Sequence, residues 1–180
     1  MNKINPQLIV NFSKNDRRAA EILFNQLRRP LFGYLYRMSN DSFVAEDLLQ
    51  ETLLTIHARI ETYNKDYEFM PWAYTIARNK FFEFKRSQTR VIRVFSIDQN
   101  DFESHKTGCF SEQLEISADI AEALYSLSES VKEAFVLKHF QGLTFNEVAD
   151  LQEIPLPTAK SRVLFAVRKV REYMNRGEKS

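Results

Sequence analysis

Apolar residues recur every three or four positions along most of this 180-residue sequence, and this spacing constrains the fold more than any other feature. The repeat matches the turn of an α-helix that buries one face. In the first half, one series runs over 23–38, a second over 45–63 and a third over 72–84. Pro30 lies inside the first series and is expected to kink or split that helix. The sequence therefore predicts an all-α fold.

The periodicity is lost between about residues 91 and 115, so most of this segment is expected to be linker. Helical spacing resumes over 120–140, and Gly142 is expected near the end of that segment. We therefore expect two small helical domains, at 10–92 and 116–176, joined by a flexible linker at 93–115.

Residues 144–173 have the features of a helix-turn-helix. Thr144 and Glu147 form a capping-box pattern before a short helix, residues 152–155 suit a turn, and Pro157 suits the first position of a longer helix. The buried stripe of the longer helix is expected at Ala159, Val163, Ala166, Val170 and Tyr173. Side chains available to base edges and phosphates lie largely off this stripe, at Thr158, Lys160, Ser161, Leu164, Arg168 and Arg171. The unit predicts DNA binding, and a helical hairpin with a solvated basic face is the alternative.

A second pattern is an acidic row on the helix expected over 45–63. The row consists of Asp47, Gln50, Glu51 and Leu54, spaced to share one helix face opposite the apolar stripe. Asp47 and Glu51 repel one another weakly across one turn, so local helix stability does not explain them. The row suits a protein partner that presents a basic helix, although a solvated face is a common outcome for such rows.

The third pattern is a mixture of rings and cations at 70–90. Five aromatic residues stand among Arg78, Lys80, Lys85, Arg86 and Arg90, with Glu83 as the single acid. Aromatic faces stack on unpaired bases, and cations follow the nucleic-acid backbone. Trp72 and Ile76 are expected in the core. The alternative is a well-packed helix whose cations are only solvated.

Charge is segregated although the formal net charge is only +1. Residues 70–93 carry six basic residues and one acid, and residues 156–180 carry seven and two. Between them, residues 94–155 hold twelve acids and three lysines. Each basic segment can therefore attract a polyanion locally.

The residues that carry catalytic chemistry are sparse. His57, His105 and His139 are scattered, and the His105–Cys109 pair offers two ligands where a zinc site needs four. We find no glycine-rich phosphate loop or nucleophile motif, so we expect no enzyme activity, no cofactor and no metal site. The sequence has no membrane-length apolar run, no signal-peptide pattern and a single cysteine, which favours a cytoplasmic location.

The order of these segments resembles bacterial RNA polymerase sigma factors of the extracytoplasmic-function (ECF) type, in the sigma-70 superfamily. The residues that carry the resemblance are "EDLLQETLL" at 46–54, "PWAYTIARNKFFEFKR" at 71–86, "LTFNEVA" at 143–149 and "TAKSRV" at 158–163. The resemblance implies that region 2, the N-terminal domain, binds core polymerase and melts the minus-10 promoter element. Region 4, the C-terminal domain, would read the minus-35 element.

The resemblance also implies roles for individual residues. The clamp helices of the polymerase beta-prime subunit would be bound by Asp47, Gln50, Glu51 and Leu54. The minus-10 DNA would be bound by Tyr63, Asn64, Lys65, Trp72, Tyr74, Arg78, Asn79, Lys80, Lys85 and Arg86, with Asn79, Lys80 and the loop 61–68 capturing a flipped base. The minus-35 DNA would be bound by Thr144, Thr158, Lys160, Ser161, Arg162, Leu164, Phe165 and Arg168.

Four positions depart from the family pattern. Glu153 stands where the turn usually has glycine, at a position that prefers a positive φ, so backbone strain or a shifted turn is expected. Pro157 also replaces a common glycine. Phe165 and Val167 stand at positions that are often basic, where they would contact thymine methyls or pack within the domain.

The expected partners are core RNA polymerase, through the beta-prime clamp helices and the beta flap, together with promoter DNA and an anti-sigma factor. The acidic linker and the apolar side chains of Leu54, Leu164 and Phe165 are the candidate anti-sigma contacts. The alternative function is that of a stand-alone helix-turn-helix regulator with an N-terminal sensor or dimerisation domain.

Overall fold

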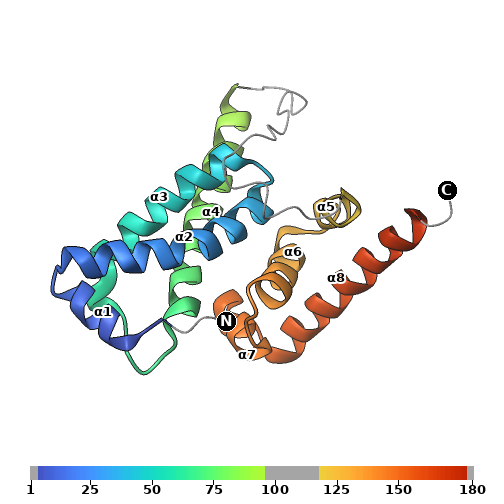
Figure 1. The fold of residues 1–180 in the computed structure, drawn as a ribbon. Coiled ribbons are helices and arrows are strands. Elements are labelled where there is room, and N and C mark those ends of the chain that lie inside the picture. Colours follow the sequence, from blue (N-terminus) through green and yellow to red (C-terminus); the bar gives the residue numbers. More distant parts are fainter. Residues whose placement is uncertain (1–3, 96–117, 178–180) are drawn as a thin grey trace. The chain divides into compact units, whose positions relative to one another are not determined.

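The computed structural model describes residues 4–95 and 118–177, and every regular element in these ranges is a helix. The chain divides into two compact units, one holding helices α1 to α4 and the other α5 to α8 (Figure 1). The all-α fold is therefore confirmed. Most of the predicted linker lies outside the described residues, but its first part does not: α4 (Phe69–Phe95) continues to residue 95.

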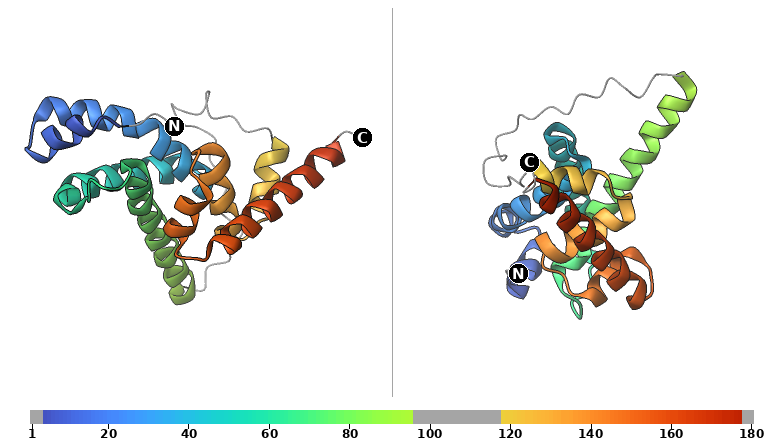
Figure 2. Two further views of the ribbon diagram at one scale, coloured as in Figure 1. Left: turned by 90° about the horizontal axis from the view of Figure 1, so that it is seen from below. Right: turned by 90° about the vertical axis from the view of Figure 1, so that its right-hand side faces the viewer.

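The N-terminal unit is built on three long helices. α2 (Arg17–Ser39) and α3 (Ser42–Arg59) lie side by side, and α4 crosses them steeply (Figures 1 and 2). A short 3-10 helix, η1 (Ile60–Thr62), follows α3. The predicted stripe of α2 is confirmed, since Leu23, Leu27, Leu31, Leu35 and Met38 are all buried. Asp16 and Asp41 cap α2 and α3 by accepting hydrogen bonds from backbone N–H groups.

Pro30 does not split the first long helix as one reading of the sequence expected. α2 runs without interruption from Arg17 to Ser39, with Pro30 in its interior. Proline removes one backbone hydrogen bond from a helix. Leu27 and Leu31, on either side of Pro30, are both fully buried. Tertiary packing on this face therefore holds the helix together through the proline.

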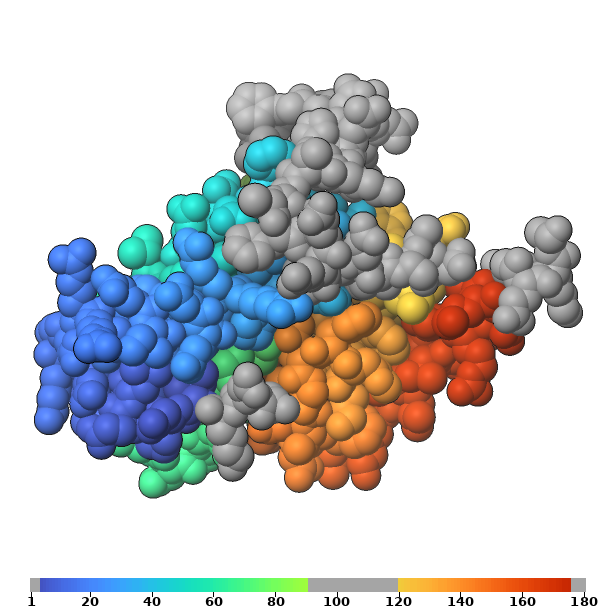
Figure 3. All heavy atoms as spheres, in the orientation of Figure 1, coloured from blue at the N-terminus to red at the C-terminus, as the bar shows by residue number. Residues whose placement is uncertain are grey.

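Helix α1 (Pro6–Ser13) was not anticipated. The side chain of Asn5 accepts a hydrogen bond from the backbone N–H of Gln7, and Pro6 occupies the first turn. Ile9 and Phe12 are buried, and the Phe12 ring meets the rings of Phe24 and His57 edge to face, at 5.5 and 5.4 Å between centroids. The space-filling view shows α1 lying against the start of α2 (Figure 3).

The C-terminal unit consists of α5 (Ala118–Tyr125), α6 (Glu129–Phe135), the π-helical turn η4 (Val136–Phe140), α7 (Phe145–Gln152) and α8 (Leu156–Gly177). α8 contacts α5, α6 and α7. Its predicted stripe is confirmed: Ala159, Val163, Ala166 and Val170 are buried, with Tyr173 half-buried. Within the described residues, no helix is both long and apolar enough to cross a membrane.

The predicted helix-turn-helix is confirmed as α7, a turn and α8. Thr144 and Glu147 form a complete capping box at the start of α7. Glu153 ends α7 in the left-handed region at φ 56°, as its place in the turn predicted, and Gly142 has φ 71° before the capping box. α8 begins at Leu156, one residue before Pro157.

Candidate functional site

The acidic row lies on the exposed face of α3. Asp47, Gln50 and Glu51 are exposed, and Leu54 is 71% exposed. The opposite face of α3 supplies the buried residues Ala45, Leu49 and Ile56. An apolar side chain this exposed beside carboxylates forms a surface that a partner with basic and apolar groups can cover.

The row meets the basic face of α4 at Lys80. The Lys80 Nζ atom lies 3.2 Å from a carboxylate oxygen of Glu51 and 3.8 Å from one of Glu83. The Lys80 side chain is 26% exposed and the Glu51 side chain 57% exposed, so water screens the pair and its contribution to stability is small, about 0–1 kcal/mol. The sequence placed these two residues in different binding sites, whereas the structure places them in contact.

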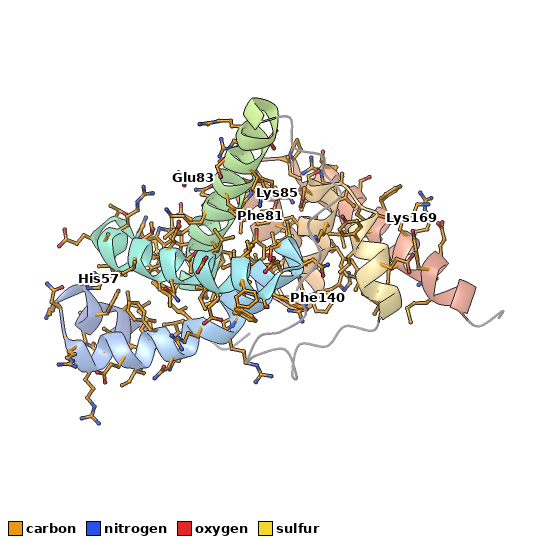
Figure 4. All side chains as sticks on the ribbon, turned by 90° about the horizontal axis from the view of Figure 1, so that it is seen from above. His57, Phe81, Glu83, Lys85, Phe140 and Lys169 are labelled. Atoms are coloured by element: carbon orange, nitrogen blue, oxygen red, sulfur yellow. The ribbon has the colours of Figure 1, made fainter. Side chains whose placement is uncertain are left out.

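The outer face of α4 carries the remaining predicted cations. Asn79, Lys85 and Arg86 are exposed, and Arg86 donates through Nε to the backbone carbonyl of Phe82 at 3.1 Å. The Arg78 guanidinium lies 4.9 Å from the centre of the Phe82 ring. Figure 4 shows Phe81, Glu83 and Lys85 along this helix. Phe81 is fully buried, so the helix carries its rings partly in the core and partly beneath the cations.

Tyr74 must be removed from the predicted minus-10 set. Its side chain is 1% exposed, and its ring packs edge to face on Tyr34 of α2, with 5.6 Å between centroids. Burial raises the pKa of its hydroxyl, and the neighbouring Arg37 opposes that shift. A ring in this position cannot stack on a base unless the domain unpacks, so Tyr74 is a core residue.

The connection between α3 and α4 is anchored by an aromatic cluster. Tyr63, Phe69 and Trp72 lie within 5.1 to 5.3 Å of one another, centroid to centroid. The Tyr63 hydroxyl donates to the backbone carbonyl of Tyr67, and burial together with Glu68 raises the Tyr63 pKa. Trp72 is half-buried here, which agrees with its expected packing role.

Exposed groups project from the same connection. Asn64 and Lys65 are exposed, and the Asn64 side chain accepts a hydrogen bond from the backbone N–H of Asp66. Tyr67 is 72% exposed and was not singled out from the sequence. The sequence feature that could have identified Tyr67 is its place in a short polar loop directly before the aromatic-basic helix, because an aromatic ring in such a loop is not expected to be buried.

The outer face of α8 presents most of the predicted minus-35 residues. Lys160, Ser161 and Arg168 are exposed, together with the apolar side chains of Leu164, at 65%, and Phe165, at 40%. Thr158 is half-buried in the first turn. The Arg168 guanidinium lies 5.4 Å from the centre of the Phe165 ring, which keeps cation and ring on one surface.

Two predicted minus-35 residues are engaged within the domain. The Thr144 hydroxyl donates to Glu147 at 2.8 Å and accepts from the Glu147 backbone N–H at 3.2 Å. Arg162 is half-buried, and its guanidinium donates to the side-chain oxygen of Gln152 at 2.8 Å. The structure thus separates these two residues from the freely exposed row of Lys160, Ser161 and Leu164.

Comparison with protein families agrees with this architecture. The family model described as Sigma-70 region 2 matches residues 23–91, and the one described as Sigma-70, region 4 matches residues 117–170. The two matches follow one another along the chain and correspond to its two units. A region 2 match in the N-terminal half favours a sigma factor over a stand-alone regulator with a sensor domain.

Individual relatives cover nearly the whole chain. The RNA polymerase sigma factor CarQ of Myxococcus xanthus is 29% identical over 91% of this chain and 93% of its own. The ECF RNA polymerase sigma factor SigM of Bacillus subtilis is 25% identical over 86% and 94%. The RNA polymerase sigma-H factor of Pseudomonas aeruginosa is 24% identical over 89% and 88%.

Two solved structures share the fold. The sigma factor RpoE from Bartonella quintana, in complex with the anti-sigma factor NepR, superposes with a TM-score of 0.71 at 24% identity, covering 86% of this chain and 96% of that one. CnrH, in complex with the cytosolic domain of CnrY, gives 0.68 at 17% identity over 93% and 95%. With both sigma-70 regions in order and relatives matched over most of their own length, the chain belongs to the sigma-70 family as an alternative sigma factor of the ECF type.

Proposed function

We propose that this sigma factor divides transcription initiation among three surfaces. The α3 row binds the clamp helices of core polymerase, and the outer face of α4 with the loop 63–68 holds the opened minus-10 strand. The exposed row of α8 reads the minus-35 element. The protein supplies binding energy and no catalytic group of its own, and it acts in the cytoplasm, where the polymerase is.

The exposure of the α3 row is the observation that carries this proposal. Asp47, Gln50, Glu51 and Leu54 share one face of α3 and are all exposed, although Leu54 would gain from burial. Lys80 stands at the edge of this row, on the helix assigned to the minus-10 strand. Polymerase and opened DNA would thus be held on adjoining faces of α3 and α4.

Reconstitution tests the proposal. The purified chain is mixed with core polymerase and the promoter of its own operon, and co-elution with core and the transcript are measured. We expect a stable complex and a transcript that starts only when the chain is present. A chain that neither co-elutes with core nor supports a transcript would refute the proposal.

We further propose that an anti-sigma factor covers the exposed apolar side chains of Leu54, Leu164 and Phe165. A solved structure of similar fold contains an anti-sigma factor, and these three residues are 71%, 65% and 40% exposed. Changing all three to serine should leave the chain folded and weaken its binding to an anti-sigma factor encoded beside its gene. Full affinity in a folded triple variant would contradict this assignment.

A further inference from the structure

A chain of hydrogen-bonded polar side chains joins α6 to both helices of the helix-turn-helix. The side-chain nitrogen of Gln152, on α7, donates to the carboxylate of Glu133, on α6, at 2.8 Å and to the backbone carbonyl of Ser130 at 2.9 Å. The side-chain oxygen of Gln152 accepts from the guanidinium of Arg162, on α8, at 2.8 Å. Glu133 is 1% exposed and Gln152 is 5% exposed. We call Glu133, Gln152 and Arg162 the polar relay.

The partners of Gln152 permit one orientation of its amide. Its nitrogen faces two acceptors, and its oxygen faces a guanidinium, which can only donate. Turning the amide over would place its oxygen against the carboxylate and its nitrogen against the guanidinium. Because both ends of Gln152 are matched in a buried site, the relay ties α8 to α6 and α7 in a single arrangement.

The conformation of the turn between α7 and α8 indicates why a hydrogen-bonded link between these helices matters. Glu153 stands in the left-handed region at φ 56°, a conformation that a residue with a side chain adopts only against a cost. The turn therefore favours the observed angle between the two helices less than a turn with glycine at this position would. Arg162, six residues into α8, holds that angle from beyond the turn.

The relay separates Arg162 from the exposed cations of α8. Lys160 and Arg168 are exposed, whereas Arg162 is half-buried and directs a guanidinium nitrogen inward to Gln152. We propose that Gln152 and Arg162 are positioning residues for promoter binding: they set the angle of α8 against α7, and Arg162 does not neutralise a DNA phosphate. This inference rests on the proposed function. It assigns Arg162 to the residues that orient α8 and not to those that contact DNA.

Salt dependence distinguishes a positioning cation from a phosphate contact. Each phosphate contact on duplex DNA contributes about 0.9 to the slope of log affinity against log salt concentration. Binding of holoenzyme to a duplex carrying the minus-35 element is measured between low and moderate salt. Arg162→Gln should weaken binding about tenfold at every salt concentration and leave the slope unchanged. The matched control, Arg168→Gln on the exposed face, should make the dependence on salt weaker, reducing the magnitude of the slope by about 0.9. If Arg162→Gln lowers the slope as Arg168→Gln does, Arg162 is a contact residue and the inference is wrong.

An exchange of two side chains provides a second test that tolerates a loss of stability. Gln152→Glu places a second carboxylate against Glu133 in a buried site, so promoter binding should fall about tenfold. Adding Glu133→Gln restores a donor to that carboxylate, which also accepts from Arg162, and should return binding to within about threefold of the parent. Thermal unfolding of each variant confirms that it is folded.

The failure of the inference and that of the proposed function differ. If the parent holoenzyme does not bind the promoter, the proposed function fails. If the parent binds and the folded double variant remains as weak as Gln152→Glu, the relay does not position α8. On a pre-melted template that lacks the minus-35 element, all relay variants should match the parent, because α8 has nothing to read there.

Discussion

At the scale of single residues, burial assigns roles that residue type alone does not. Tyr74 and Asn79 stand five positions apart on α4, and the sequence placed both on the DNA surface. Tyr74 is 1% exposed against Tyr34, whereas Asn79 is exposed. The difference depends on which side of α4 meets α2. The sequence of an aromatic-rich helix does not show which side is buried, because aromatic rings suit a protein core and a stack of bases equally well.

Asn79 is the first residue to test on the exposed side. Asn79→Ala removes an amide that can hydrogen-bond a flipped base, so opening of duplex promoter should fall more than binding to a pre-melted promoter. Both templates are compared in open-complex assays with holoenzyme. Asn25→Ala, an exposed asparagine on α2, is the control and should change neither. An equal loss of Asn79→Ala on both templates would count against base capture.

Glu153 supports a stability prediction. Its φ of 56° is more favourable for glycine than for glutamate, so Glu153→Gly should raise the free energy of unfolding of the C-terminal unit by about 1 kcal/mol. Arg171→Gly, at an exposed position inside α8, should instead lower it by about 1 kcal/mol. Chemical denaturation measures both. A destabilised Glu153→Gly would show that the Glu153 side chain makes a contact worth more than the backbone cost.

At the scale of helices, local signals were predicted well and distant ones were not. The Thr144–Glu147 capping box was predictable because its partners are three residues apart, and the same holds for the α8 stripe. The Gln152–Glu133 contact spans 19 residues and exists only after α6 and α7 meet, so no spacing in the sequence announces it. Helix α1 was missed because eight residues are too few to show a period, although Asn5 and Pro6 carry the start signal.

The α3 row has its own test. Asp47→Arg with Glu51→Arg reverses the charge of an exposed face, so the domain should stay folded while co-elution with core polymerase is lost. Glu21→Arg with Glu61→Arg makes the same change in charge at exposed acids outside the row and should leave co-elution intact. Size-exclusion chromatography with core reports both. Co-elution of the row variant at the parent level would refute the role of the α3 row.

At the scale of the whole molecule, a net charge of +1 conceals two basic segments. Six of the cations in these segments are exposed, namely Lys85, Arg86 and Arg90 on α4 and Lys160, Arg168 and Arg171 on α8. The affinity for DNA should therefore depend on salt far more than the net charge indicates. The fold class and the order of the two units followed from periodicity and charge. The choice between contact and support residues within each unit required the packing.

The exposed cations of α4 allow the salt dependence of DNA binding to be tested. Lys85→Gln with Arg86→Gln removes two exposed cations, and the salt slope for binding a single-stranded minus-10 oligonucleotide to holoenzyme should fall by about 1.4. Arg28→Gln with Arg29→Gln, which are exposed on α2, is the matched control and should not change the slope. An unchanged slope in the α4 variant would show that Lys85 and Arg86 do not contact the phosphates of the single-stranded DNA.

The anchored loop between α3 and α4 has a consequence for the proposed binding of the minus-10 strand. Tyr63, Phe69 and Trp72 close the ends of the loop, and the Tyr63 hydroxyl reaches across it to Tyr67. The entropy of ordering this segment is therefore lost once, when the domain folds. A base that enters a loop already ordered retains more of its stacking energy as affinity. If this loop holds the opened minus-10 strand, as we propose, the cost of ordering it falls on protein folding, before any DNA is bound.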